Sequence, residues 1–126
     1  MEFIKSNPHP KGKKIGDCVI RALAIADNKN WIDVYKDLIG VGLKIYDMPN
    51  SKPVYEYYLE TQGWKKQPMP RHPSGKRMKL SEFIDQNPDI EFVANVIKHM
   101  ATVKYGKLFD TWNCGHKCIG NYFLKL

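Results

Sequence analysis

The sequence contains a cysteine, a histidine and an aspartate of the kinds that thiol hydrolases use: Cys18, His99 and Asp110. In that chemistry a thiolate attacks a carbonyl carbon, an imidazole passes a proton to the leaving amine, and a carboxylate holds the imidazole in the required tautomer. The reaction needs no cofactor. A single cysteine is a candidate nucleophile only when the fold supplies a base. The prediction therefore depends on the elements that would bring these three side chains together.

The segment around Cys18 is typical of the start of a helix. Gly16 and Asp17 form a turn and an N-cap, and the Asp17 carboxylate is expected to accept hydrogen bonds from the first helical N–H groups. Apolar residues then recur with the helical period, at Val19, Ile20, Leu23, Ala24 and Ala26. Cys18 is thus placed at the first helical position, where the helix N-terminus favours the thiolate and lowers the pKa from about 8.5. The alternative is a small buried core residue.

A hairpin is predicted to bring His99 and Asp110 together. Tyr105-Gly106 is typical of a two-residue turn, so Lys104 pairs with Lys107 and Asp110 lies opposite Ala101. His99 is then a diagonal neighbour of Asp110, about 7 to 8 Å away at Cβ. A carboxylate at that distance can reach an imidazole. The alternative is that His99 is a half-buried strand residue and Asp110 an ordinary turn residue.

The composition indicates one folded domain. The chain has 126 residues, of which 43% are hydrophobic, enough for a single core. No apolar run reaches the ~18 residues of a membrane helix, and the polar start lacks the apolar centre of a secretory signal. We therefore expect a cytoplasmic protein without a membrane partner; its oligomeric state does not follow from the sequence.

The cysteines favour free thiols over a disulfide framework, since there are three of them. Two lie in the segment Cys114-Gly115-His116-Lys117-Cys118. Three soft ligands within five residues are too few and too close together for a tetrahedral zinc site. We predict no metal and a loop with two free thiols there, with a local disulfide as the alternative.

Four helices are predicted from apolar periodicity and capping residues. Asn30 is expected to cap the second helix with Asp33 at its third position, and Gly40 and Gly42 are expected to end it. The predicted helices are Cys18 to about Asp27, Trp31 to Ile39, a third that opens at Ser51 and Pro53 and ends at Gly63, and Leu80 to Gln86.

Runs of β-branched and aromatic residues predict strands after residue 90. They are Glu91 to Lys98, His99 to Lys104, Lys107 to Trp112 and Ile119 to Leu124, with a further short strand at Glu2-Phe3-Ile4. The fold class is α+β, with N-terminal helices packed on a C-terminal antiparallel sheet. The single domain 1–126 divides into an arm (1–14), a helical part (15–63), a basic loop (64–79) and a short helix plus sheet (80–126).

The basic residues support a second interpretation. Lys and Arg number 20 against 13 Asp and Glu, a net charge of +7 that attracts anionic partners. They gather before the first helix and in the basic loop, at Lys11, Lys13, Lys14, Lys65, Lys66, Arg71, Lys76, Arg77 and Lys79. The alternative function is a non-catalytic binding module that contacts nucleic acid or an acidic host protein. Few aromatic rings accompany these charges, which favours a solvated basic loop over a nucleic-acid surface.

Two fragments carry a family resemblance. The segments Gly16-Asp17-Cys18-Val19-Ile20-Arg21-Ala22 and His99-Met100-Ala101-Thr102-Val103, with Gly106 to Trp112, resemble papain-fold cysteine peptidases, in particular small phage-encoded members. They are also similar to bacteriocin-processing peptidase domains. The resemblance implies a papain-like fold with Cys18, His99 and Asp110 as nucleophile, base and orienting carboxylate. It also implies a peptide or isopeptide substrate and, for a phage protein, the host cytoplasm.

The sequence departs from that family in the segment before the nucleophile, which has neither the family's glutamine nor the second cysteine of plant-type papains. These enzymes resemble one another in a glutamine that precedes the nucleophile and stabilises the oxyanion, whereas no glutamine lies between Met1 and Cys18. Asn7, together with the Cys18 backbone N–H, is the predicted substitute. An oxyanion donor contributes ~100-fold or more to the rate. Peptide cleavage is the default reaction, and deamidation or acyl transfer would begin with the same attack by Cys18.

Overall fold

A computed structural model describes residues 1–125 as a mixed sheet with helices on both faces. The helices are α1 (Cys18–Asp27), α2 (Trp31–Ile45), α3 (Lys52–Thr61) and α4 (Leu80–Gln86). The strands are β1 (Glu2–Lys5), β2 (Trp64–Gln67), β3 (Glu91–Val96), β4 (His99–Lys104), β5 (Lys107–Asp110) and β6 (Ile119–Lys125). The α+β class is confirmed.

The sheet has six strands in the order β1-β5-β4-β3-β6-β2. Strand β1 pairs with β5 in parallel, and every other pair is antiparallel. The four C-terminal strands are antiparallel to one another, as predicted. The sheet as a whole is mixed, because β1, which contains the strand predicted at Glu2-Phe3-Ile4, pairs in parallel with β5 and forms one edge. The other edge is β2, which lies in the segment predicted to be a loop. Trp64 to Gln67 pair with Tyr122 to Lys125 of β6, and Trp64 is buried.

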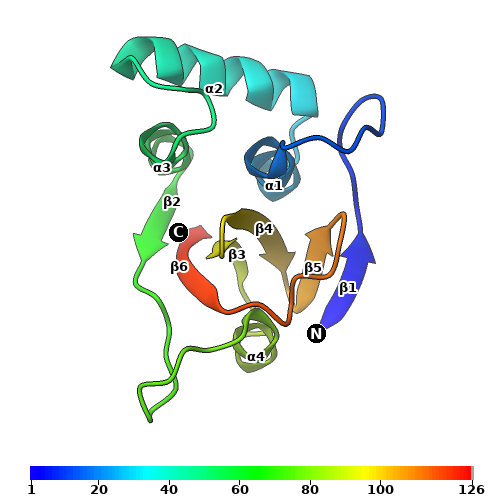
Figure 1. Ribbon diagram of the computed structural model, residues 1–126, viewed down its shortest axis with the longest axis vertical. Coiled ribbons are helices and arrows are strands. Elements are labelled where there is room, and N and C mark those ends of the chain that lie inside the picture. The colour runs from blue at the N-terminus through cyan, green and yellow to red at the C-terminus, as the bar shows by residue number, and fades with distance from the viewer. Residues whose placement is uncertain (126) are drawn as a thin grey trace.

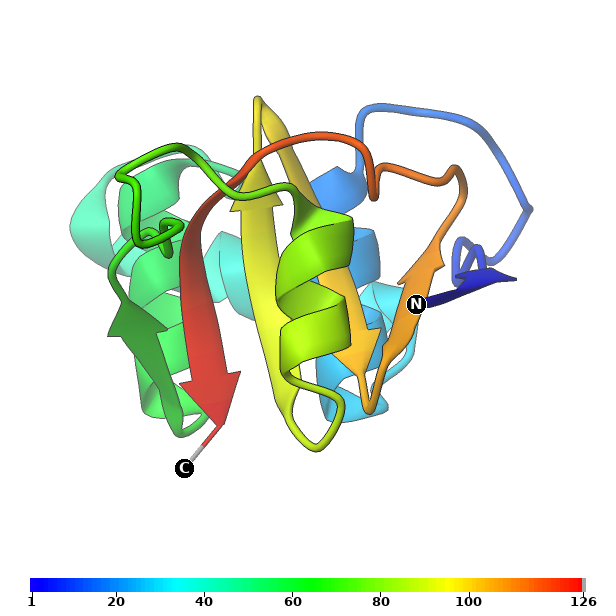
Figure 2. The same ribbon diagram turned by 90° about the horizontal axis from the view of Figure 1, so that it is seen from below.

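Three helices cover one face of the sheet and α4 covers the other (Figure 1). Helix α2 is outermost and packs on α1 and α3 rather than on the strands (Figure 1). Seen from below, α4 lies across the opposite face (Figure 2). The core on the α1 side includes Leu23, Leu38, Leu59, Val93 and Phe123, and the core on the α4 side includes Leu80, Ile84, Phe92, Val103 and Leu108. None of the helices within residues 1–125 is long and apolar enough to cross a membrane.

Helix α2 runs six residues beyond its predicted end at Ile39. The prediction was wrong because both glycines are tolerated inside the helix, at a cost of about 1 kcal/mol each relative to alanine. Gly42 is buried against the returning loop, where an added Cβ would lie 2.6 Å from the Asp47 carbonyl oxygen. Its lack of a side chain thus allows the loop to approach. The start of α2 agrees with the prediction, since the Asn30 side chain accepts a hydrogen bond from the Asp33 N–H at 2.8 Å.

The hairpin β4–β5 has the predicted register. Lys104 pairs with Lys107 and Thr102 with Phe109, and both turn residues, Tyr105 and Gly106, have positive φ. By contrast, β3 is shorter than predicted: it ends at Val96, and the exposed Ile97-Lys98 forms the turn to β4. The β-branched Ile97 favours a strand locally, but the pairing of Val96 with His99 requires a turn there.

Candidate active site

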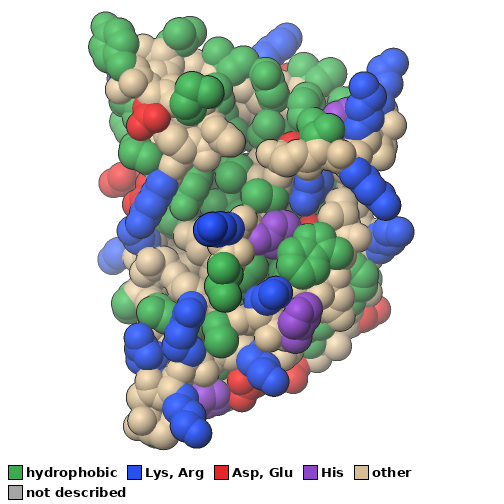
Figure 3. Space-filling view, viewed as in Figure 1, with side chains coloured by type: hydrophobic (Ala, Val, Ile, Leu, Met, Phe, Trp, Pro, Cys, Tyr) green, Lys and Arg blue, Asp and Glu red, His purple; other side chains and the backbone are tan. Residues whose placement is uncertain are grey.

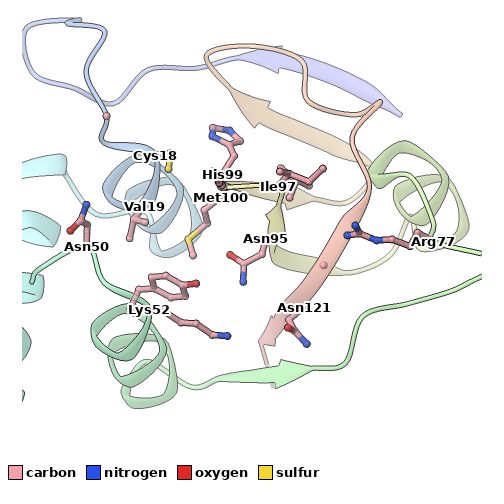
Figure 4. Close-up of a pocket in the computed structure, with 15 residues that line it drawn as sticks. Cys18, Val19, Asn50, Lys52, Arg77, Asn95, Ile97, His99, Met100 and Asn121 are labelled. Atoms are coloured by element: carbon pink, nitrogen blue, oxygen red, sulfur yellow. The ribbon is translucent and has the colours of Figure 1, made fainter. Parts of the chain in front are cut away.

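Cys18 is the first residue of α1, as predicted, and its thiol is half-buried. Helix α1 lies against β4, where the Thr102 hydroxyl donates a 2.6 Å hydrogen bond to the Ala22 carbonyl oxygen. That buried bond fixes the helix relative to the strand that begins with His99. The start of α1 is thereby placed beside the start of β4 (Figure 4).

His99 interacts with both predicted partners. Its Nε2 atom lies 2.6 Å from Oδ2 of Asp110, a hydrogen bond between two largely buried side chains. The ring also lies beside the Cys18 thiol (Figure 4), and each of the two groups shifts the pKa of the other. Because Asp110 occupies Nε2, the other ring nitrogen is available to the sulfur. The structure thus brings together the three side chains that the sequence analysis selected.

The titration of this pair is shifted in opposite directions. Burial of the Cys18 thiol opposes its ionisation, but hydrogen bonds from His99 and the Met100 N–H, together with nearby positive charge, outweigh burial and lower its pKa. For His99, burial alone would lower the pKa; hydrogen bonds with Asp110, Cys114 and Cys18, and the charge of Asp110, raise it to about 11. A thiolate beside an imidazolium is therefore favoured over the neutral pair.

Arg21 is the functional residue that the sequence analysis missed. It lies one turn after Cys18, is 7% exposed, and bonds the Asp17 carboxylate through its Nη1 atom. Its Nη2 atom lies 3.6 Å from Oδ1 of Asp110. The guanidinium thus links the start of α1 to the carboxylate that orients His99. The i, i+4 spacing of Asp17 and Arg21 was the available signal.

Asp17 does not cap α1 through its side chain, contrary to the prediction. Its carboxylate instead accepts hydrogen bonds from Arg21 and, at 2.9 Å, from the Trp31 indole N–H. A buried charged donor is a stronger partner for a carboxylate than a helical N–H, which explains the difference. As a consequence, the N–H groups of the first turn of α1 remain available to a ligand.

Asn7, the predicted oxyanion donor, does not reach Cys18. It is exposed in the arm, where its amide donates a 3.4 Å hydrogen bond to the Lys13 carbonyl oxygen. Its carboxamide also accepts a 3.1 Å hydrogen bond from the His9 N–H. Local turn formation after Asn7 thus uses the side chain that the prediction reserved for catalysis.

Cys114 joins the site from the segment between β5 and β6. It is fully buried, and its thiol donates a 3.8 Å hydrogen bond to Oδ2 of Asp110. Potential metal-ligating atoms of His99, Asp110 and Cys114 all lie within 4.8 Å of one another. However, two ligands of a tetrahedral zinc ion lie about 3.3 Å apart, whereas His99 and Asp110 are separated by 2.6 Å. Their geometry matches a direct hydrogen bond. The cysteines 18, 114 and 118 are all free, so the alternative of a local disulfide is not realised.

Two grooves meet at Cys18 and share Gly16, Cys18, Lys98 and His99. The α3 groove, about 640 Å³, is further lined by residues that include Asn50, Lys52, Tyr55, Arg77, Asn95 and Asn121. The arm groove, about 450 Å³, is further lined by Lys13, Lys14, Ile15, Thr111 and Trp112. Figure 4 shows the α3 groove, with the Cys18 sulfur and the His99 ring at one end. The thiol is thus open to an extended ligand on two sides.

The predicted basic surface is divided by the fold. Lys13, Lys14 and Arg77 line the grooves, whereas Lys65 and Lys66 lie on the edge strand β2. Lys66 pairs with Glu56 at 3.3 Å, and Arg71 bonds the Gly75 carbonyl oxygen within its own loop. Lys11, Lys76 and Lys79 line neither groove. The nine residues therefore do not form one continuous patch.

Comparisons with protein-family models, with curated proteins and with solved structures found no match.

Proposed function

We propose that this protein is a papain-like thiol hydrolase that cleaves a peptide or isopeptide bond through Cys18, His99 and Asp110. The observation that carries the proposal is the position of His99, which is hydrogen-bonded to Asp110 through Nε2 and lies beside the thiol of Cys18 (Figure 4). A lowered thiol pKa beside a raised imidazole pKa is the condition that a cysteine nucleophile needs at neutral pH. A cysteine that only filled the core would need neither a histidine beside it nor a buried carboxylate that binds that histidine.

In the proposed reaction, the Cys18 thiolate adds to the amide carbonyl carbon and forms a C–S bond. The imidazolium of His99 gives its proton to the amide nitrogen as the C–N bond breaks, which releases the amine and leaves a thioester. Water then attacks the thioester carbonyl and gives a proton to His99, so that the carboxylic acid leaves and the thiolate and imidazolium are restored. Asp110 keeps the ring in orientation through its hydrogen bond with Nε2.

The oxyanion of each tetrahedral intermediate is assigned to the start of α1. The first N–H groups of a helix lack intrahelical acceptors and carry partial positive charge. Cys18 is the first helical residue, so its own N–H and that of Val19 lie next to the attacking sulfur. The Cys18 N–H keeps the role that the sequence analysis gave it, and the Val19 N–H takes the role given to Asn7.

The papain-like fold is part of the proposal. It is supported by a cysteine at a helix start that packs on a sheet, followed in the chain by strand-borne histidine and aspartate. The same resemblance extends the proposal to a phage-encoded enzyme in the host cytoplasm. Deamidation and acyl transfer differ only in what receives the acyl group from the thioester.

Alkylation tests the nucleophile. We expect iodoacetamide at pH 7 to modify Cys18 at least about tenfold faster than Cys118, because the pKa of Cys18 is lowered. Peptide mass spectrometry after digestion measures the rate at each cysteine. His99→Ala should abolish the difference, and His116→Ala, which alters a histidine outside the triad, should leave it.

Peptide hydrolysis tests the reaction. A mixture of peptides incubated with the protein should show new termini by mass spectrometry, and Cys18→Ala should produce none. Equal alkylation of Cys18 and Cys118, or cleavage that persists in Cys18→Ala, would contradict the proposed function.

A further inference from the structure

The cleft formed by the α3 groove and the arm groove carries positive charge on both sides of Cys18. Apart from the buried Arg21, its cationic lining residues are Lys13, Lys14, Lys52, Arg77 and Lys98. Within residues 1–125, neither groove has a lining aspartate or glutamate. In the space-filling view, Lys and Arg side chains lie around the middle of this face, whereas acidic side chains lie mainly at its margins (Figure 3).

These charges come from four separate parts of the chain. Lys13 and Lys14 belong to the arm, Lys52 to the first turn of α3, and Lys98 to the turn before His99. Arg77 lies beyond β6, on the other side of the groove from Lys52 (Figure 4). The fold therefore brings these charges together, and the basic surface predicted from the sequence included neither Lys52 nor Lys98.

Most of these charges have no carboxylate to neutralise them. Within residues 1–125, no carboxylate oxygen lies within 4.0 Å of a side-chain nitrogen of Lys13, Lys14 or Lys98. Arg77 donates only a 3.5 Å hydrogen bond to the Ile119 carbonyl oxygen. Lys52 lies 3.8 Å from Glu56, so part of its charge is already compensated. The cleft is left with unpaired positive charge facing the position of a bound ligand.

From this arrangement we infer that the substrate is a peptide segment with acidic side chains on both sides of the amide that Cys18 attacks. The inference rests on the proposed function. Carboxylates on one side of the reacting amide would meet Lys52 and Arg77, those on the other side would meet Lys13 and Lys14, and Lys98 lies at the centre.

A peptide fits the cleft better than a nucleic acid because of the uncharged polar groups that line it. Asn50, Asn95 and Asn121 line the α3 groove. Each carboxamide offers both a donor and an acceptor, which matches the C=O and N–H groups of a peptide backbone. A phosphate group offers acceptors only, so the acceptor oxygen of a carboxamide that faces a phosphate would remain unused. The carboxamides thus favour a polypeptide.

Peptide binding to Cys18→Ala tests the inference without turnover. Three fluorescein-labelled peptides would be compared by fluorescence anisotropy: the same 12 residues with Glu, Gln or Lys at two positions on each side of a central amide. An exposed ion pair contributes about 1.5- to 5-fold to affinity. With four Glu residues, the Glu peptide should therefore bind at least about fivefold more tightly than the Gln peptide, with a difference that shrinks as NaCl rises.

Charge-reversal variants locate the site. Lys52→Glu with Arg77→Glu, and separately Lys13→Glu with Lys14→Glu, should each remove most of the preference for Glu over Gln. The matched control, Lys36→Glu with Lys107→Glu, makes the same change in net charge at exposed positions that line neither groove. The control should keep the preference for the Glu peptide over the Gln peptide within about twofold of the value for Cys18→Ala alone.

Three results would overturn the inference: equal affinity for the Glu and Gln peptides, a control that loses as much as the cleft variants, or tighter binding of a single-stranded oligonucleotide of equal charge. Failure here differs from failure of the proposed function. Reactive Cys18 without a preference for acidic peptides would reject only the substrate class, whereas selective binding with unreactive Cys18 would reject only the hydrolase.

Discussion

His99 depends on Asp110 for both its orientation and its charge. The carboxylate holds Nε2 at 2.6 Å and is the leading cause among those that raise the pKa of the imidazole to about 11. Asp110 in turn accepts a 2.7 Å hydrogen bond from the Thr111 N–H and lies near the Arg21 guanidinium. These two contacts hold the Asp110 carboxylate in place beside the His99 ring.

The first prediction concerns the pH dependence of alkylation. The Cys18 thiolate is lost as pH falls through its lowered pKa, and the His99 imidazolium is lost as pH rises through about 11. The wild-type rate with iodoacetamide should therefore stay high between these values. Asp110→Asn removes the carboxylate that supports the imidazolium, so the pKa of His99 falls and that of Cys18 rises. The rate at pH 6 should drop about tenfold or more.

At pH 10 the two proteins should react within a few-fold of each other, because an ordinary thiol is largely ionised there. Asp89→Asn, which changes an exposed carboxyl group, is the control and should follow the wild-type profile. Superimposable profiles for Asp110→Asn and wild type would show that the carboxylate does not govern the pair.

At the scale of elements, the site depends on how α1 is held between its neighbours. Thr102 joins it to β4, and Arg21 joins it to β5. On its outer side α1 packs against α2, which continues through two glycines before the chain turns back toward α3. The returning chain contacts the helix at Gly42, where the Asp47 N–H donates a 2.9 Å hydrogen bond to the Gly42 carbonyl oxygen.

The second prediction compares the two glycines of α2. Gly42→Ala places a Cβ 2.6 Å from the Asp47 carbonyl oxygen, and we expect the free energy of unfolding to fall by about 1 to 3 kcal/mol. In Gly40→Ala the added Cβ has no neighbour within 4 Å, so the better helix propensity of alanine should raise the free energy of unfolding by up to about 1 kcal/mol. Urea denaturation followed by circular dichroism measures both. A loss of stability in Gly40→Ala equal to that in Gly42→Ala would contradict this account.

At the scale of the whole molecule, the three cysteines differ only because the chain is folded. Cys18 is half-buried beside an imidazolium, Cys118 is half-buried in a connecting segment, and Cys114 is fully buried beneath Asp110. In an unfolded chain all three would be ordinary thiols with a pKa of about 8.5. Their reactivities therefore report on the tertiary structure.

The third prediction follows their alkylation through unfolding. At neutral pH, Cys114 should stay unmodified in the native protein and become reactive in parallel with the loss of circular dichroism signal as urea rises. Over the same range the rate at Cys18 should fall, because unfolding separates it from His99. Site-resolved mass spectrometry measures both rates. Modification of Cys114 at low urea, before the signal changes, would show that its segment opens independently of the fold.

Much of the site follows from local sequence. The helix start at Cys18 and the two-residue turn at Tyr105-Gly106 are short-range patterns, and the turn alone determines the register that pairs His99 with Asp110. The cap at Asn30 and the helix at Leu80–Gln86 were also predictable for local reasons. The continuation of α2 through its two glycines and the turn at Ile97-Lys98 could not be predicted in this way. At those positions tertiary packing overrides weak local preferences.

The amino-acid sequence alone thus determined the α+β class, the placement of Cys18 at a helix N-terminus and the proximity of His99 to Asp110, since each depends on residues within about a dozen positions of one another. Only the tertiary structure placed α1 against β4, buried Arg21 and Cys114 beside Asp110, and gathered Lys52, Arg77 and Lys98 around the thiol. These contacts join segments far apart in the chain, and no periodicity or turn encodes them. They form because apolar faces and buried charges must each find a partner when the core closes.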